Sequence, residues 1–310
     1  MSDLDRAVDT VLDQCLGVKK GEDVLVVTDP ERTSIAEALV RAARKMGADA
    51  VLAEMAERDN HGVEPPRSVA AALGACDVFV APTTKSLSHT EARRAASAKG
   101  VRGATMPTVT EDLLVRTMSA DYAGIKKRSL EVAELLTRGS EVRITTDAGT
   151  DVTMVIEGRS GAPDTGDLTA RGSFGNLPAG EAFLAPVEER TNGRVVFDGV
   201  VGTEPMEVEI VDGYATSFSP SGESWRAQAE SYGRDAFAIA ELGIGTNDSA
   251  TLTGNVLEDE KIMGTIHIAF GDNHTFGGTI RVSSHQDFVV LNPTVTIDNT
   301  LVIESGTFLL

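Results

Sequence analysis

The chain has 310 residues, of which 41% are hydrophobic, so it can bury the core of one large or two ordinary domains. It carries 28 Lys and Arg residues against 47 Asp and Glu, a formal net charge of −19, which repels phosphate backbones and anionic lipid. Nucleic acid and membrane surfaces are therefore excluded as expected partners. The acidic N-terminus does not resemble a secretion signal, and we expect a cytoplasmic protein.

The first 138 residues predict a small doubly wound α/β domain. Short valine-rich runs are typical of buried parallel strands, and alanine-rich segments between them are typical of helices. Expected strands cover residues 23–29, 49–55, 77–84 and 101–107, and expected helices cover 34–47, 67–76 and 90–100. Thr33 or Ser34 is expected to cap the first helix. No glycine-rich phosphate-binding motif follows a strand, so a nucleotide cofactor has no support.

Residues 139–310 predict a β-rich α+β catalytic domain. One long helix or a broken pair over 110–138 leads into it. Alternating apolar and polar residues between glycine turns then predict a hairpin and further strands. These segments cover 140–159, 192–201, 206–218 and 301–310. A single helix is expected over 224–240.

Three of the five histidines, His267, His274 and His285, lie close together in the sequence, and Asp287 follows the last of them. Residues i and i+2 of a strand share a face, so His285 and Asp287 are expected to project into one site. Imidazoles and carboxylates are ligands for transition metals. The cluster predicts a metal centre; the alternative is a pair of polar residues on a solvated strand.

Two glutamates lie in apolar surroundings, which favours burial. Glu181 precedes an Ala-Phe-Leu-Ala run, and Glu241 follows what is expected to be a helix end. A buried carboxylate is costly unless it is paired or bound to metal. The charge run over residues 258–261 is interpreted first as a solvated loop. The other hypothesis is that one of its acids enters the site, while Lys261 orients a ligand or binds a substrate carboxylate. His89, near a strand end, is a second candidate for substrate contact or else a surface residue.

The ligand count leaves two kinds of chemistry open. Two glutamates, two or three histidines and an aspartate suit two metal ions that activate a bridging water for hydrolysis. His267, His285 and Asp287 alone would satisfy the two-histidine, one-carboxylate triad of Fe(II) oxygenases. His274 is interpreted as a third nitrogen ligand, a general acid, a donor to an oxyanion, or an ordinary loop residue.

Several motifs in fixed order resemble the M29 family of metallo-aminopeptidases: NLPAGEAFLAP, ELGIGTN, EDEKIMGTIHIAFGDN and HQD. The resemblance implies a homodimeric hydrolase of short peptides or another small molecule. It also implies two divalent ions, zinc, manganese or cobalt, with a bridging hydroxide. The metal ligands implied are Glu181, Glu241, His267, His285 and Asp287. Glu181, Glu241 or His274 would then move the proton.

The chain departs from the peptidases near the reaction centre. His274 stands where the family carries a tyrosine, and the segment before His285 is short. The superfamily resemblance also includes dihydroxypyridine ring-opening dioxygenases, which use one Fe(II) held by two histidines and an aspartate. We rank this alternative second because both Glu181 and Glu241 are present. A metal-storing or ligand-binding protein is the non-enzyme alternative.

Overall fold

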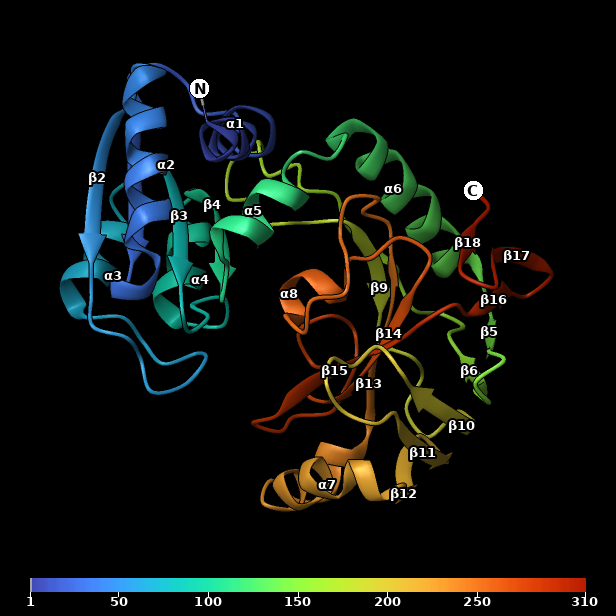
Figure 1. The fold of residues 1–310 in the computed structure, drawn as a ribbon. Helices are drawn as coiled ribbons and strands as arrows, with labels where there is room; N and C mark the ends of the chain where they lie inside the picture. Colours follow the sequence, from blue (N-terminus) through green and yellow to red (C-terminus); the bar gives the residue numbers. More distant parts are fainter. Residues whose placement is uncertain (1) are drawn as a thin grey trace. The chain divides into compact units, whose positions relative to one another are not determined.

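The computed structural model describes residues 2–310, which form two compact units (Figure 1). The first unit contains the chain up to Ala123 together with Gly166–Ala179. The second contains Gly124–Thr165 and Gly180–Leu310. This partition differs from the boundary expected after residue 138, because most of the last long helix belongs to the second unit and a later segment returns to the first.

The first unit is a doubly wound α/β fold, as predicted. Its five parallel strands lie in the order β2-β1-β3-β4-β8. The strands are β1 (Asp23–Thr28), β2 (Asp49–Glu54), β3 (Val78–Thr83), β4 (Arg102–Pro107) and β8 (Phe174–Asn176). The helices are α1 (Asp3–Asp9), a π-helical segment (Thr10–Cys15), a 3₁₀ turn (Pro30–Arg32), α2 (Thr33–Lys45), α3 (Arg67–Leu73), α4 (Glu91–Ala98) and α5 (Glu111–Thr117).

The expected cap of α2 is wrong in detail. Thr33 is the first helical residue, and its hydroxyl donates to the Glu54 carboxylate and to the Pro30 carbonyl. The hydroxyl therefore holds the loop after β1 to the end of β2 and does not accept from a helix amide. At the other end, Gly47 has φ +87°, a left-handed conformation that suits glycine beyond a helix end, as expected.

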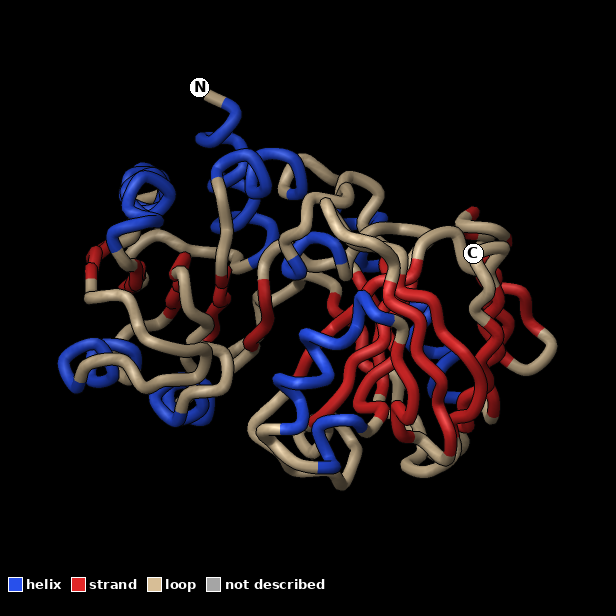
Figure 2. The backbone as a smooth tube through the Cα atoms, turned by 60° about the horizontal axis from the view of Figure 1, so that its bottom comes forward, coloured by secondary structure: helices blue, strands red, loops and turns tan. Residues whose placement is uncertain are grey.

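The second unit is built mainly of strands, drawn in red in Figure 2. One antiparallel sheet has eight strands in the order β12-β11-β10-β6-β5-β16-β17-β18, and the other has five in the order β15-β14-β13-β9-β7. The eight are β5 (Glu141–Thr145), β6 (Asp151–Val155), β10 (Thr191–Phe197), β11 (Met206–Val211), β12 (Tyr214–Phe218), β16 (Thr294–Ile297), β17 (Thr300–Glu304) and β18 (Thr307–Phe308). The five are β7 (Ala162–Asp164), β9 (Glu181–Leu184), β13 (Ile239–Gly245), β14 (Ile266–Gly271) and β15 (His285–Val290). The helices are α6 (Tyr122–Arg138), a 3₁₀ turn (Pro220–Gly222), α7 (Glu223–Glu230), a 3₁₀ turn (Arg234–Phe237) and α8 (Val256–Asp259).

The helix expected over 224–240 is shorter than predicted. It ends at Glu230, and Gly233 has φ +91°, which turns the chain out of the helix. A short 3₁₀ turn follows, and then β13 begins at Ile239. Glu241 therefore lies within a buried strand and not at a helix end, and this places it in a sheet.

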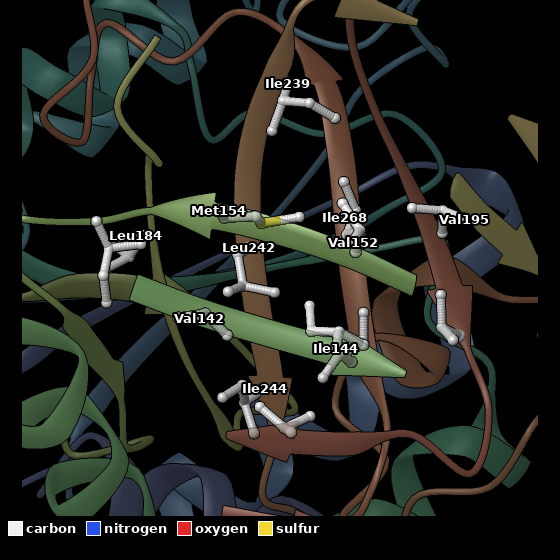
Figure 3. Packing of buried hydrophobic residues seen from close by; sticks show 14 of the residues in the cluster. Val142, Ile144, Val152, Met154, Leu184, Val195, Ile239, Leu242, Ile244 and Ile268 are labelled. Carbon is white, nitrogen blue, oxygen red and sulfur yellow. The ribbon is translucent and has the colours of Figure 1, made fainter. Parts of the chain in front are cut away.

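The core of the second unit lies between its two sheets (Figure 3). In that view β5 and β6 cross over β13, and their aliphatic side chains meet. The labelled residues include Val142, Ile144, Val152, Met154, Leu242, Ile244 and Ile268. Burial of each such side chain contributes about 1.5–3 kcal/mol. One face of the five-stranded sheet is thus committed to the core, which leaves the opposite face for polar side chains.

Candidate metal centre

The polar face of the five-stranded sheet follows from the alternation in β13. Leu242 and Ile244 point into the core, so Glu241, Gly243 and Gly245 share the other face. All of β13 is buried, so this face is covered as well. A carboxylate in such a strand must have charged or hydrogen-bonding neighbours.

Strand register brings two of the predicted residues into line with Glu241. Glu241 pairs with Ala269 of β14, which in turn pairs with Asp287 of β15. The three residues form one row across three strands, with a small alanine in the middle. His285, two residues before Asp287, pairs with Gly271. The expectation that His285 and Asp287 share a face is confirmed by the 3.4 Å between His285 Nε2 and Asp287 Oδ1.

The other two predicted residues pair with glycines of β13. Gly245 lies opposite Glu181 of β9, and Gly243 lies opposite His267 of β14. Because neither glycine has a side chain, the larger side chains opposite can lie across the strand. All five residues with metal-ligand chemistry are thereby on one face of one sheet.

Two imidazoles converge on one carboxylate. His267 Nε2 lies 3.3 Å from Glu241 Oε1 and 3.4 Å from Glu181 Oε2. His285 Nε2 lies 3.5 Å from Glu241 Oε2 and 3.4 Å from Asp287 Oδ1. Both oxygens of Glu241 are therefore shared between the histidines, and each Nε2 faces two carboxylates.

The surroundings of these atoms fit a bound cation. His285 Nδ1 donates to the Asp272 carbonyl at 2.8 Å, so Nε2 carries the lone pair. A lone pair that faces two carboxylates is repelled unless a proton or a metal ion lies between them. Among the described residues, buried Glu181 Oε2 and His267 Nδ1 have no hydrogen-bond partner. Divalent ions prefer this mixed set of nitrogen and oxygen donors.

The pKa values of the two histidines also show that this face favours positive charge. Burial disfavours the imidazolium form of His285, yet Asp287 and Glu241 outweigh it and raise the pKa of His285 to about 10. Against the same effect of burial, Glu241 and Glu181 raise the pKa of His267 to about 9. Burial raises the pKa of Glu181 to about 8. The carboxylates on this face therefore favour a positive charge at both imidazoles.

The charge run before β14 is buried, so its interpretation as a solvated loop is wrong. Glu258 accepts from the amide of Thr251, and Asp259 accepts from the amides of Thr253 and Gly254. These contacts join the last residues of α8 to the loop that precedes the helix. The following residues, Glu260 and Lys261, thereby lie beside Glu181 on the polar face of the five-stranded sheet.

Lys261 is 2% exposed and lies among three carboxylates. Its Nζ is 2.5 Å from Glu181 Oε1, 2.8 Å from Glu260 Oε1 and 3.6 Å from Asp164 Oδ2. The ammonium group is already surrounded by acceptors, which does not support the substrate contact expected of Lys261.

The two remaining candidates are His274 and His89. His274 follows β14, and its Nδ1 is 2.8 Å from the Asp272 carboxylate. Within residues 2–310, none of the three groups able to hold a metal includes His274. His89 is an exposed residue of the first unit, between β3 and α4. The catalytic role of His274 and the substrate contact of His89 both stay predictions.

Sequence reasoning missed three residues on or beside this face, Phe183, Phe276 and Asp164, and left open whether an acid of the run that contains Glu260 enters it. Phe183 alternates with Glu181 in β9 and could have been found from that spacing. Phe276 lies edge to face against both Phe183 and His285, with ring centroids 5.7 and 5.9 Å apart. Asp164 and Glu260 join through strand pairing and loop packing, which leave no motif in the sequence.

Comparison with known proteins identifies the family. The family model described as NicX, 2,5-dihydroxypyridine 5,6-dioxygenase, matches residues 3–310, so the chain belongs to that family. The structure of 2,5-dihydroxypyridine dioxygenase from Pseudomonas putida KT2440 has a TM-score of 0.85 and 20% identity, covering 100% of this chain and 98% of that one. Wild-type AmpT from Thermus thermophilus has a TM-score of 0.73 and 16% identity, covering 99% of both chains. No curated protein matches the chain.

These findings confirm the fold and correct the function expected from the sequence. The similarity to AmpT supports the fold that the M29 resemblance implied. The prediction of an aminopeptidase that hydrolyses peptides is wrong, because a dioxygenase family model matches residues 3–310. The motifs misled because they contain the residues with metal-ligand chemistry and pack the sheet, and such residues do not distinguish the two chemistries. Within residues 2–310, no helix has the length and apolar character that crossing a bilayer requires.

Proposed function

We propose that this protein is a metal-dependent dioxygenase that opens the ring of a dihydroxylated pyridine or a similar small aromatic substrate. The observation that carries the proposal is the convergence of two imidazoles and Asp287 around Glu241, in a chain that belongs to a dioxygenase family. Two histidines and one carboxylate, with positions left open, form the ligand set of non-heme Fe(II) oxygenases.

His267, His285 and Asp287 would hold the metal, with Glu241 positioned as a further oxygen donor. When bound, a ferrous ion supplies the one-electron chemistry that dioxygen needs to react with a closed-shell aromatic ring. The chain itself orients the donors: the Asp272 carbonyl fixes the ring of His285, and the alternation in β15 places Asp287 beside it. Glu241 and Glu181 are close enough to the imidazoles to accept a proton from a substrate hydroxyl bound there.

Aromatic side chains beside the metal ligands support an aromatic substrate. Phe183 and Phe276 are both half-buried, and Phe276 also lies against the ring of His285. Flat apolar rings next to a metal centre favour a flat ring as ligand. A pocket of about 240 Å³ along the edge of β15 also reaches Asp287.

The test is oxygen consumption by purified protein reconstituted anaerobically with Fe²⁺. We expect oxygen uptake with 2,5-dihydroxypyridine, together with loss of the absorbance of the aromatic ring. The control is protein loaded with Zn²⁺, which binds the same donors and has no accessible redox state. Equal consumption without iron, or no consumption with a panel of dihydroxylated pyridines and benzenes, contradicts the proposal.

We also retain two expectations from the sequence, a homodimer and a cytoplasmic location. Light scattering of the purified protein tests the first, and fractionation of the source cells tests the second.

A further inference from the structure

The loop between β14 and β15, residues 272–284, brings an aromatic side chain to the polar face of the five-stranded sheet. The ring of Phe276 lies edge to face against His285, with centroids 5.9 Å apart, and against Phe183, with centroids 5.7 Å apart. Surface connections are usually mobile, so an aromatic side chain held in one place on such a loop needs a physical cause. The hydrogen bonds of the loop supply that cause.

Asn273 closes the base of the loop tip. Its side-chain oxygen accepts from the Ile280 amide at 2.8 Å, and its own amide donates to the Ile280 carbonyl at 3.2 Å. Its carbonyl accepts from the amides of Phe276 and Gly278. A Cβ on Gly278 would lie 2.0 Å from Asn273 Cγ, so the turn packs directly against this buried side chain. Residues 274–279 are thereby closed into one compact turn.

Glu188 fastens this turn from a different part of the chain, the connection between β9 and β10. Its Oε1 accepts from the Thr279 amide at 2.7 Å and from Asn273 Nδ2 at 3.3 Å. Its Oε2 pairs with the Arg159 guanidinium, which also donates to the Gly277 carbonyl. The side chains of Arg159 and Glu188 are only 15% and 19% exposed, so solvent screens their attraction less than at an open surface.

The base of the loop is held independently of Glu188. The Asp272 amide donates to the Ser284 carbonyl at 2.8 Å, and the Asp272 carbonyl accepts from His285 Nδ1 at 2.8 Å. Within residues 2–310, none of the three groups able to hold a metal contains Glu188. Loss of the Glu188 contacts should therefore release the tip that carries Phe276 and leave the orientation of the His285 ring unchanged.

We propose that Glu188 is a positioning residue for the aromatic substrate: it holds the loop so that Phe276 forms a wall of the substrate site beside His285. A wall that is already in place spares the cost of ordering the loop when the ring binds. Glu188 thus sets the affinity for substrate through Phe276. The identity of the ligand rests on the proposed function, whereas the position of Phe276 does not depend on it.

The first measurement is the affinity of Zn²⁺-loaded protein for 2,5-dihydroxypyridine, titrated by calorimetry without oxygen so that no turnover occurs. Glu188→Ala should weaken binding roughly 2- to 12-fold, as loss of the Phe276 contact itself would. Combining Glu188→Ala with Phe276→Ala should cause no further loss, because the two residues act as a unit. Glu188→Gln keeps an oxygen for the Thr279 amide and should recover part of the affinity. The affinity for Zn²⁺ should stay unchanged in all of these variants.

The matched control removes a similar carboxylate elsewhere in the second unit. Glu207 of β11 pairs with Arg194 of β10 in the eight-stranded sheet, on strands that do not hold the loop. Glu207→Ala should bind the ring as tightly as the wild type.

The second measurement reads the position of Phe276 without any ligand. A neighbouring aromatic ring shifts the nuclear magnetic resonance signal of the His285 ring protons. The chain has five histidines, and the signal of His285 is the one lost in His285→Gln. This signal should move alike in Glu188→Ala and Phe276→Ala and stay in place in Glu207→Ala.

Two results would overturn the inference. One is wild-type affinity or an unmoved His285 signal in folded Glu188→Ala, and the other is independent, multiplied losses in the double variant. Circular dichroism checks the fold. If Glu188→Ala does not fold, Glu188→Gln, which removes only the charge that faces Arg159, is judged against the same outcomes.

The two measurements separate the inference from the proposed function. A wild type that binds no dihydroxylated ring, while its His285 signal still responds to Glu188→Ala, fails only the dioxygenase proposal. A protein that binds the ring equally well with and without the Glu188 carboxylate fails only the inference about Glu188.

Discussion

The ring of His267 lies directly over Gly243 in the neighbouring strand. A Cβ added at residue 243 would come within 2.0 Å of His267 Cε1 and 2.1 Å of Nε2. The two residues are register partners of β13 and β14, so strand pairing sets their separation. The position of this imidazole beside Glu181 and Glu241 therefore depends on the absence of a side chain across the strand.

Gly243→Ala should displace the His267 ring and weaken metal binding. Changes that misorient a metal-bound histidine typically cost about 10- to 100-fold in affinity, and we expect a loss in this range. Titration of metal-free protein with Zn²⁺ measures it. The matched control is Gly74→Ala in the first unit, where the nearest atom to a Cβ would be the flexible end of Lys99, at 2.9 Å. Equal affinities in both variants would show that His267 does not bind the metal.

His285→Ala should abolish tight metal binding and leave the fold intact. His285 lies on edge strand β15 and its side chain is about a third exposed (32%), so its removal opens little core. Metal at 100 times its Kd stabilises a folded protein by about 2.7 kcal/mol, and this increment should disappear. Thermal unfolding with and without metal measures it. His274→Ala serves as control, and a retained metal response in His285→Ala refutes the assignment.

Metal and protons should compete for the same imidazoles. The pKa values of His267 and His285, raised to about 9 and 10, mean that both rings are protonated at pH 7 in the metal-free protein. Metal binding must then release protons, so affinity should rise between pH 7 and 9. Calorimetry in two buffers of different ionisation enthalpy counts the protons. Binding without proton release would contradict this account.

The same shifts set the pH dependence of stability of the metal-free protein. Since the folded-state pKa values exceed the ordinary 6.5, the two imidazolium ions contribute stability fully below pH 6.5. That contribution should be lost as pH rises through 9 to 10. Thermal unfolding across this range measures the loss, with His267→Gln/His285→Gln as control. A control that loses as much stability as the wild type would assign the effect to other groups.

Phe276→Ala should weaken binding of an aromatic substrate without removing metal. Aromatic pairs contribute about 0.5–1.5 kcal/mol beyond the area they bury, so KM should rise roughly 2- to 12-fold. Steady-state oxygen uptake measures KM, and elemental analysis checks the metal. Phe308→Ala, in β18 of the eight-stranded sheet, is the matched control. An unchanged KM in Phe276→Ala would place the substrate elsewhere.

Much of the fold could be predicted from the pattern of apolar and polar residues along the sequence. The valine-rich runs of the first unit became parallel strands, because such runs fit a sheet covered on both faces. The pair His285 and Asp287 was readable too, since a strand places residues i and i+2 on one face. The helix predicted up to residue 240 was wrong. The alanine-rich composition continues past Gly233, but the helical backbone ends at Glu230 and Gly233 adopts a positive φ.

The sequence by itself determined which residues have metal-ligand chemistry, because their types and apolar surroundings are local properties. Only the tertiary structure decided how they meet. Register across β9, β13, β14 and β15 sets Glu181, Glu241, His267 and Asp287 on one face, and register depends on pairing between distant segments. The burial of Lys261 among Glu181, Glu260 and Asp164 is likewise a product of loop packing, and no spacing in the chain encodes it.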